Sequence, residues 1–375
     1  MIYFDNAATS FPKAPQATRE ALLCMLTNGG NPGRGAHKLS LRAAEKIFAC
    51  REDLSDFLGV GAPERIIFTQ NTTYALNMAI KGLVKTGDHV LCSELEHNAV
   101  MRPLYALQKE KGITLDTFPV IGLGDEQIME NIAARVGQST TLLVCLHASN
   151  ICSVSLPIAK IGAFCRAHGI RFAVDAAQSA GHLPIDMCAM QIDALALPGH
   201  KGLLGPAGCG VLALGEDLSL GTFIEGGSGV DSRSNEMPAA FPERFEAGTL
   251  PTPAIAGLAG GLSFVTSFGL STIEKHEKEL FLAARERIES LAGFEVYQRE
   301  TPGGVLLFNH TAIPSTELAR QLDKAGICVR AGLHCAPRAH DALGTPAGGA
   351  ARLGFGIFNT HRELDALWRT LKDLP

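Results

Sequence analysis

Short strand-like runs alternate with helical patterns from residue 65 onward, and this alternation limits the possible folds more than any other feature of the chain. Residues 140–146 and 170–174 are continuous apolar strands, which suit a sheet that is buried on both faces. A helical segment at residues 156–168 lies between them. Strands and helices in this order predict an α/β fold with a mainly parallel sheet.

The pattern changes after Pro253, where helical stretches at residues 254–268 and 271–291 follow one another. A chain of 375 residues also exceeds the usual size of a single core. We therefore expect a large domain at residues 16–255 and a smaller α+β domain formed by residues 1–15 and 256–375. The other expected strands cover residues 65–69, 89–92, 193–197, 294–297, 305–308 and 327–330, and the other expected helices cover 73–84, 99–111, 315–325 and 361–371.

Composition and charge argue against several classes of partner. The formal net charge is −5, which gives no basic surface for nucleic acid or for an anionic membrane. The longest apolar runs, such as residues 141–148, are too short to span a bilayer, and the first residues do not resemble a signal peptide. The ten cysteines form no C-x-x-C pair, so we expect no metal site. A cytoplasmic protein is the expectation.

Lys201 is the first candidate for chemistry. It stands directly after the apolar segment 193–197, in a tight loop with Gly199 and Gly202 nearby. Glycine lets a backbone approach a ligand closely. A lysine in a loop is normally a solvated charge, but partial burial would lower its pKa and make it an amine that can form a Schiff base.

Asp175 ends the apolar run 170–174, and open α/β sheets bind ligands at the carboxyl ends of their strands. One interpretation is that Asp175 caps the following helix, as aspartate often does. The other is that its carboxylate pairs with a pyridinium nitrogen and keeps the ring protonated, so that the ring acts as an electron sink. The residue alone does not decide between the two.

Two further polar turns follow predicted strands. Residues 70–73, with the sequence Gln-Asn-Thr-Thr, lead into a helix, where hydroxyl and N–H groups either bind an anion or simply cap the helix. His97 ends another strand, where an imidazole can stack on an aromatic ring or have a structural role. Each signal is weak alone, but all four groups are expected at strand ends of one sheet.

These four loops together resemble those of fold type I pyridoxal phosphate (PLP) enzymes of the class V aminotransferase family, in its cysteine desulfurase and selenocysteine lyase branch. The resemblance runs from residues 3–9 to residues 352–360. It implies a set of PLP contacts: Lys201 as the Schiff-base lysine, His97 stacked on the ring, Asp175 at the pyridine nitrogen, Gln178 at the ring hydroxyl, and Thr72, Thr73 and His200 at the phosphate. It also implies that Thr249 reaches the phosphate of a neighbouring subunit, and hence a homodimer.

The choice among PLP reactions depends on the second half of the chain. Residues 329–337 are similar to the family loop that carries a persulfide-forming cysteine, which would be Cys335. This cysteine lies beside His334 and close to Arg338 and His340, and cationic neighbours favour a thiolate. By the same resemblance Arg352 grips the substrate carboxylate, which suits a planar guanidinium, and Asn150 lies near the substrate.

The resemblance therefore predicts a cysteine desulfurase that converts L-cysteine to L-alanine and leaves a persulfide on Cys335. The sulfur would pass to an acceptor protein or a small thiol. The alternatives are a class V aminotransferase or a selenocysteine or cysteine lyase that acts without a persulfide, and a non-catalytic protein with this fold. Pro198 stands where related enzymes usually carry a phosphate-binding serine, so one phosphate contact is expected to be lost.

Overall fold

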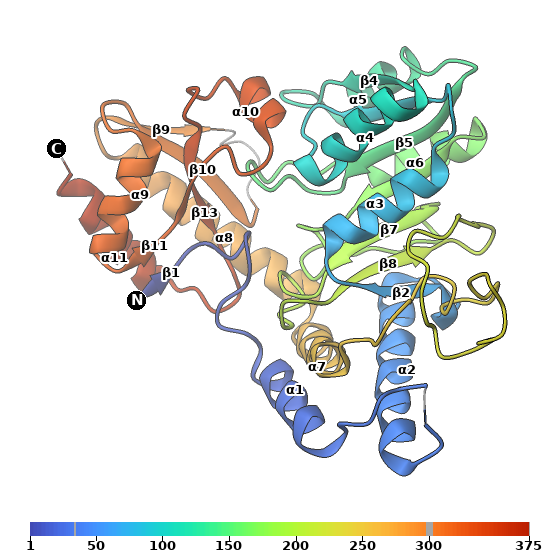
Figure 1. The fold of residues 1–375 in the computed structure, drawn as a ribbon. Helices are drawn as coiled ribbons and strands as arrows, with labels where there is room; N and C mark the ends of the chain where they lie inside the picture. Colours follow the sequence, from blue (N-terminus) through green and yellow to red (C-terminus); the bar gives the residue numbers. More distant parts are fainter. Residues whose placement is uncertain (34, 298–302, 375) are drawn as a thin grey trace.

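A seven-stranded sheet forms the centre of the larger part of the molecule (Figure 1). The computed structural model describes residues 1–33, 35–297 and 303–374. The strand order is β2-β8-β7-β6-β5-β3-β4, and the pairs from β7 to β4 are all parallel. The strands are β2 (Ile66–Thr69), β3 (His89–Ser93), β4 (Thr114–Phe118), β5 (Thr140–Leu146), β6 (Arg171–Asp175), β7 (Ala194–Pro198) and β8 (Gly210–Leu214). The predicted α/β fold with a mainly parallel sheet is confirmed.

The direction of β2 matters for the site. It pairs antiparallel with β8, and β8 pairs antiparallel with β7, so β2 runs in the same direction as β7. The carboxyl ends of β2, β3, β5, β6 and β7 consequently lie along one edge of the sheet, as does that of the edge strand β4. The loops that follow these strands carry the residues selected from the sequence.

Helices cover both faces of this sheet because successive side chains of a strand point to opposite sides. Ile67 packs with α3 (Thr72–Leu83) and α4 (Asn98–Lys111) in one apolar cluster. Its neighbours Ile66 and Phe68 belong to a second cluster on the other face. That second face is covered by α2 (Lys38–Leu58), α5 (Asp125–Ala133), α6 (Ile158–Ala167) and α7 (Thr252–Phe268). Burial on both faces explains the continuous apolar strands.

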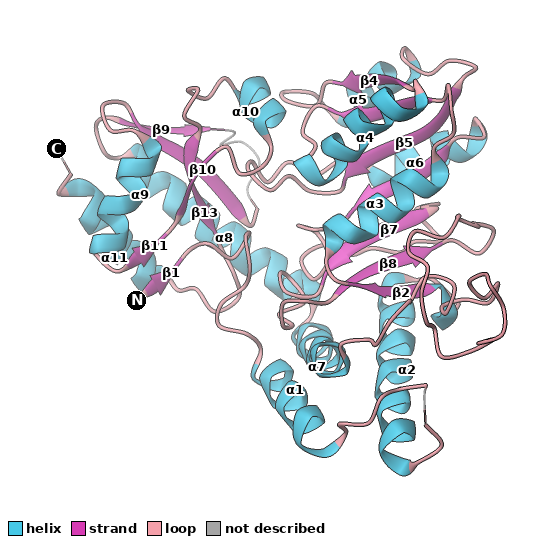
Figure 2. Ribbon diagram, in the orientation of Figure 1, coloured by secondary structure: helices cyan, strands magenta, loops and turns pink. Residues whose placement is uncertain are grey.

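The C-terminal part has its own four-stranded antiparallel sheet, with the order β12-β13-β10-β9 (Figure 2). Its strands are β9 (Phe294–Tyr297), β10 (Val305–His310), β12 (Arg330–Gly332) and β13 (Ala350–Gly354). A third apolar cluster packs this sheet against α8 (Leu270–Glu289), α9 (Ser315–Lys324) and α11 (His361–Lys372). The short helix α10 (Pro337–Leu343) follows the segment that carries Cys335.

The N-terminal segment lies against the C-terminal part. Strand β1 (Ile2–Tyr3) pairs in parallel with β11 (Ile327–Cys328), and α1 (Pro15–Thr27) packs on α7. The single strand expected at residues 327–330 is wrong: β11 pairs with β1, whereas β12 pairs with β13. The predicted division at residues 15 and 255 stays a prediction.

A buried ion pair fixes the segment that precedes Thr249. Arg51 of α2 pairs with Glu246, and it also donates a hydrogen bond to the carbonyl of Ile66. The other carboxylate oxygen of Glu246 accepts from Phe68 N at 2.7 Å. Because both charged side chains are buried, each depends on the other for compensation. The loop that carries Thr249 is therefore anchored to β2.

Three further properties of the chain concern membrane-spanning helices, disulfides and metal-binding groups. Within residues 1–33, 35–297 and 303–374, no single helix is long and apolar enough to span a membrane. The helices α7 and α8, which are bent by 81° relative to one another, reach the required length and apolar composition only when they are counted together. All ten cysteines are free. No group of three or more metal-binding side chains is found among the described residues.

Candidate active site

A cavity of about 110 Å³ lies at the carboxyl edge of the seven-stranded sheet. It brings together residues from loops that are far apart in the sequence but follow neighbouring strands. Its lining residues are Asn71, Thr72, Thr73, His97, Ala99, Leu146, Ala148, Asn150, Asp175, Ala177, Gln178, His200 and Lys201. Eight residues predicted from the sequence to bind the cofactor or the substrate line this one cavity: Thr72, Thr73, His97, Asn150, Asp175, Gln178, His200 and Lys201.

Lys201 lies in the loop that follows β7, as predicted, and this loop leads to β8, a strand that the sequence analysis did not predict. Burial lowers its pKa to about 8, and the positive charges of Arg352 and Arg330 act in the same direction. The carboxylate of Asp175 opposes this shift without cancelling it. Near neutral pH, a larger fraction of this amine is uncharged than in a solvated lysine, so it can act as a nucleophile or a base.

Asp175 is the last residue of β6 and is only 4% exposed. Burial raises its pKa, while the hydrogen bond that Ala177 N donates to its Oδ1 at 2.9 Å and the charge of Lys201 act against that rise. The side chain therefore both caps the local turn and faces the cavity. A cationic group at this place would favour the ionised carboxylate further.

The N-terminus of α3 forms another wall. Asn71 is the N-cap, and its side chain accepts a hydrogen bond from Tyr74 N. Thr72 and Thr73 occupy the first turn, where backbone N–H groups and the helix dipole favour an anion. His200 lines the same cavity, and burial lowers its pKa to about 4, so a phosphate would meet a neutral imidazole there.

His97 is the N-cap of α4, and its Nδ1 accepts from Ala99 N at 3.0 Å. Burial, and next the positive charge of Lys201, lowers the pKa of His97 to about 4. The ring is therefore neutral near pH 7 and carries its proton on Nε2. The next residue connects the site to the loop that carries Cys335, at residues 329–337, which we call the cysteine loop. Asn98 N donates a hydrogen bond to the carbonyl of Cys335 at 2.7 Å.

The cysteine loop is held against the cavity by its backbone. His334 and Cys335 both have left-handed conformations, with φ of 49° and 57°, which residues other than glycine rarely adopt. The side chain of Asn150 donates to the carbonyl of His334 at 2.9 Å. Together with the Asn98 contact, this places Cys335 next to two segments that line the cavity, while its own side chain is exposed.

The expectation that the neighbouring histidines give Cys335 a cationic environment is wrong. His334 and His340 stack with 5.3 Å between ring centroids and share a contact of 3.1 Å between Nδ1 and Nε2. Burial lowers the pKa of both, that of His334 to about 2, so both are neutral near pH 7. Arg338, the third neighbour expected from the sequence, donates its hydrogen bonds to Tyr105 and Thr117.

Arg352 is 1% exposed and lies in β13, directly opposite Arg330 of β12. One of its terminal nitrogens donates to the carbonyl of Asn150 at 2.9 Å, and the other donates to Asp5 Oδ1 at 2.7 Å. A substrate carboxylate could bind Arg352 in the predicted two-pronged manner only by displacing or rearranging the Asp5 contact.

Three charged residues near the site were missed by the sequence analysis. Asp5 holds Arg352, Arg330 adds positive charge, and Lys13 donates to the carbonyl of His200 at 2.7 Å. Burial lowers the pKa of Lys13 to about 8, as it does for Lys201. These residues come from the N-terminal segment and from β12, and no local sequence pattern predicts contacts between residues so far apart in the chain.

Thr249 does not line this cavity. It is exposed, it accepts a hydrogen bond from Asn31 at 3.3 Å, and it lines a separate cavity with residues of β2 and α3. Within one chain, the predicted cofactor contacts are therefore gathered in one place except for this threonine.

The chain belongs to the class V aminotransferase family, whose sequence model matches residues 2–367. Members of this family are PLP enzymes. A probable cysteine desulfurase from Methanothermobacter thermautotrophicus is 32% identical, over 100% of this chain and 94% of the relative. A cysteine desulfurase from Salmonella dublin is also 32% identical, over 98% and 91%.

Solved structures agree with the sequence matches. The apo structure of a cysteine desulfurase from Thermococcus onnurineus has a TM-score of 0.90 at 30% identity, covering 99% of this chain and 94% of the other. The fold is therefore the fold type I architecture of PLP enzymes. The cavity also fits PLP in its chemistry: it offers a lysine of lowered pKa, a buried carboxylate, a neutral imidazole and a helix N-terminus for the phosphate.

Proposed function

We propose that this chain is a PLP-dependent cysteine desulfurase, which converts L-cysteine to L-alanine and retains the sulfur on Cys335. The observation that carries the proposal is the placement of an exposed cysteine beside a cavity that contains Lys201. Asn98 N donates a hydrogen bond to the Cys335 carbonyl and the Asn150 side chain donates one to the His334 carbonyl, which supports a role for the thiol at this cavity. The names of the relatives support the same activity.

PLP would be held by the residues that line the cavity. Thr72, Thr73 and His200 would bind its phosphate, Asp175 would pair with its ring nitrogen, Gln178 would bind its ring hydroxyl, His97 would stack on its ring, and Lys201 would attach it covalently; all of these residues line the cavity. When bound, PLP supplies an electron sink that stabilises negative charge at the substrate α-carbon. The phosphate would meet a neutral imidazole at His200 and would gain no hydrogen bond from Pro198, which has no hydroxyl.

Lys201 moves the proton. Its lowered pKa leaves part of the amine unprotonated near neutral pH, so Nζ can accept the proton from the substrate α-carbon. The carboxylate of Asp175 acts to raise the pKa of Lys201 and so favours the protonated form of Nζ once the proton is taken.

Cys335 takes the sulfur. Its thiolate attacks the substrate sulfur, so that an S–S bond forms and the C–S bond breaks. The electron pair of the C–S bond stays with the carbon skeleton, which takes up protons to give alanine. The exposed position of Cys335 lets a sulfur-acceptor protein or a small thiol reach the persulfide afterwards.

The test is a product assay. Purified enzyme loaded with PLP and supplied with L-cysteine should release one alanine for each sulfide in the presence of a reducing thiol. Selenocysteine and cysteine sulfinate are assayed in parallel to rank the substrates. Pyruvate and ammonia, or transfer of the amino group to a keto acid, would contradict the proposal and favour a lyase or aminotransferase without a persulfide.

Substrate binding gives the first mutational prediction. We expect Arg352→Lys to raise KM for cysteine by about 10- to 100-fold, or roughly 1.4–2.8 kcal/mol, because a point charge replaces a planar two-pronged donor. kcat should change much less, since Lys201 and Cys335 are untouched. Steady-state kinetics measures KM and kcat separately. Arg338→Lys is the control, because Arg338 contacts Tyr105 and Thr117. A normal KM with a reduced kcat would contradict this role for Arg352.

We further propose that the enzyme is a homodimer. Helix α1 exposes Leu22, Met25 and Leu26, and α2 exposes Leu41 and Phe48. Both helices pack on α7, and exposed apolar side chains of this number are typical of a surface that another chain covers. Asn31 lies between these helices and bonds Thr249, so the same interface would bring Thr249 to the partner's phosphate site.

Hybrid dimers test this arrangement. Lys201→Ala removes the lysine that would attach PLP, and Thr249→Val removes the hydroxyl that would reach the partner's phosphate site. A hybrid dimer of the two variants contains one site with both native residues. After subunit exchange at equal amounts, half of the dimers are hybrids with one native site each, so the hybrids alone should contribute about one quarter of wild-type activity and the mixture should exceed the mean of the parents. A fully active monomer in analytical ultracentrifugation would contradict the shared site.

A further inference from the structure

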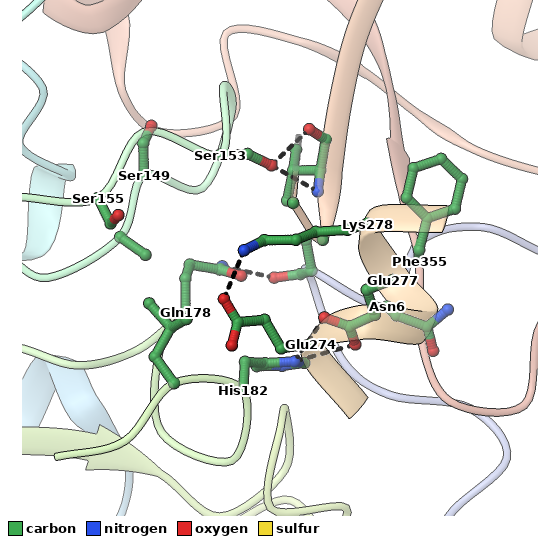
Figure 3. A pocket seen from close by; sticks show the side chains of 16 residues that line it. Asn6, Ser149, Ser153, Ser155, Gln178, His182, Glu274, Glu277, Lys278 and Phe355 are labelled. Carbon is green, nitrogen blue, oxygen red and sulfur yellow. Dashed lines mark hydrogen bonds and ion pairs between the residues drawn. The ribbon is translucent and has the colours of Figure 1, made fainter. Parts of the chain in front are cut away.

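A second cavity, of about 280 Å³, lies between the loops of the large sheet and helix α8 (Figure 3). Ala148 and Gln178 line both this cavity and the one that contains Lys201, so the two cavities share a wall. Two ion pairs from α8 enter it: Glu274 with Lys278, and Glu277 with His182. None of these four residues has a part in the reaction proposed above.

The pair of His182 and Glu277 is more buried than the pair of Glu274 and Lys278, and it joins two elements that are far apart in the sequence. Nδ1 of His182 lies 3.0 Å from both carboxylate oxygens of Glu277, and Glu277 is 3% exposed. The contact joins α8 to the turn that follows Asp175 and Gln178. Glu274 and Lys278, by contrast, are one helical turn apart on α8 and are only partly buried, so their contact, 2.6 Å long, joins no second element.

His182 in turn packs on the residue that follows Lys201. A methyl group added at Gly202 would lie 2.5 Å from two atoms of the His182 ring and 2.3 Å from the carbonyl oxygen of Ala180. A methyl group at Gly181 would lie 2.4 Å from the backbone of Gly202. The turn at residues 180–182 and the Lys201 loop are therefore in direct backbone contact, with no space for a side chain between them.

We propose that Glu277 and His182 are a positioning pair for Lys201. Glu277 fixes the imidazole, the imidazole packs on Gly202, and Gly202 fixes the backbone from which the Lys201 side chain extends. Because α8 belongs to the part of the chain that carries Cys335 and Arg352, the pair also links that part to the Lys201 loop. This inference rests on the proposed function, in which Lys201 binds PLP and moves the proton.

The charges around His182 are consistent with a lasting ion pair. Burial alone would lower the pKa of His182, but the carboxylate of Glu277 outweighs it and raises the pKa. Lys201 acts in the opposite direction from the neighbouring loop. Glu274 and Lys278 also face this cavity from α8, but they neutralise one another. The contact between the His182 ring and the buried carboxylate of Glu277 fixes the position of the ring, which a positioning role requires.

The experiment compares Glu277→Ala with Glu274→Ala, a change of the same kind on the same helix and in the same cavity. In the PLP-free protein, competitive labelling with an amine reagent across pH gives the midpoint at which Lys201 becomes reactive. Glu277→Ala should raise that midpoint by about half a pH unit or more, since a loosened loop admits water and stabilises the ammonium. Glu274→Ala should leave it unchanged.

Kinetics of the PLP-loaded enzyme supply the second measurement. Glu277→Ala should lower kcat about tenfold with little change in KM for cysteine, because the substrate contacts are intact. Glu277→Gln keeps a hydrogen-bond acceptor and the side-chain volume, so it should retain more of kcat than Glu277→Ala. It is the control for the case in which Glu277→Ala fails to fold. The double variant with His182→Ala should be no worse than the poorer single variant.

The outcomes separate this inference from the proposed function. If Lys201 binds PLP covalently but Glu277→Ala matches Glu274→Ala in labelling midpoint and kcat, the positioning role is wrong and the proposed function stands. If borohydride reduction fixes no PLP on Lys201 of the wild-type protein, the proposed function fails first.

Discussion

Lys201→Ala is expected to abolish turnover of cysteine, with a loss of about 10⁴-fold or more in kcat, because the variant lacks both the attachment amine and the base. The visible absorption band of the wild-type protein should disappear, and borohydride should no longer fix PLP on the chain. Some PLP should still bind without a covalent bond, since the contacts from Asp175, His97 and the N-terminus of α3 remain.

Lys13 is the matched control for this experiment. Burial lowers its pKa to about 8, as for Lys201, and it contacts the carbonyl of His200 in the same region. In the Lys13→Ala variant, peptide mapping after borohydride reduction should still find PLP on Lys201. Label on Lys13, or on a surface lysine such as Lys81 or Lys160, would contradict the assignment of Lys201.

Cys335→Ala should lose desulfuration of cysteine by at least about two orders of magnitude, since the nucleophile that accepts the sulfur is removed. The side chain is exposed, so its removal should have little effect on folding. The spectral change on adding cysteine should persist because the cavity is intact. Turnover of selenocysteine could survive in this variant, because the weaker C–Se bond can break without a protein nucleophile.

Cys188→Ala is the control for the cysteine experiment. Cys188 is also exposed, but it lines a different cavity, near the beginning of β7. Its loss should leave desulfuration unchanged. Full activity of Cys335→Ala toward cysteine would contradict the persulfide mechanism and favour a lyase or aminotransferase.

The sequence predicts the carboxyl edge of the sheet well, because each loop there follows a buried strand with strong apolar character. Asp175 ends β6, Lys201 follows β7, and His97 lies in the loop after β3, as expected. Strand β4 was missed because it lies at the edge of the sheet, and most of its side chains are exposed or only half-buried. Its apolar pattern is correspondingly weak.

Contacts between distant segments could not be predicted in the same way. Asp5 pairs with Arg352 across 347 positions of sequence, and His182 pairs with Glu277 across 95. Nothing local to Glu277 distinguishes it from the other charged residues of α8. The charge state of His334 was also misjudged, since its burial against His340 is visible only in the folded chain.

Mass spectrometry of the wild-type enzyme after a single turnover tests the central claim most directly. The PLP-loaded protein is mixed with slightly less than one equivalent of L-cysteine in the absence of reducing thiols, quenched by alkylation and digested. The account predicts one added sulfur on the peptide that bears Cys335, in an amount that matches the alanine released. Alanine released with no added sulfur on Cys335, or with the sulfur on another cysteine, would contradict it.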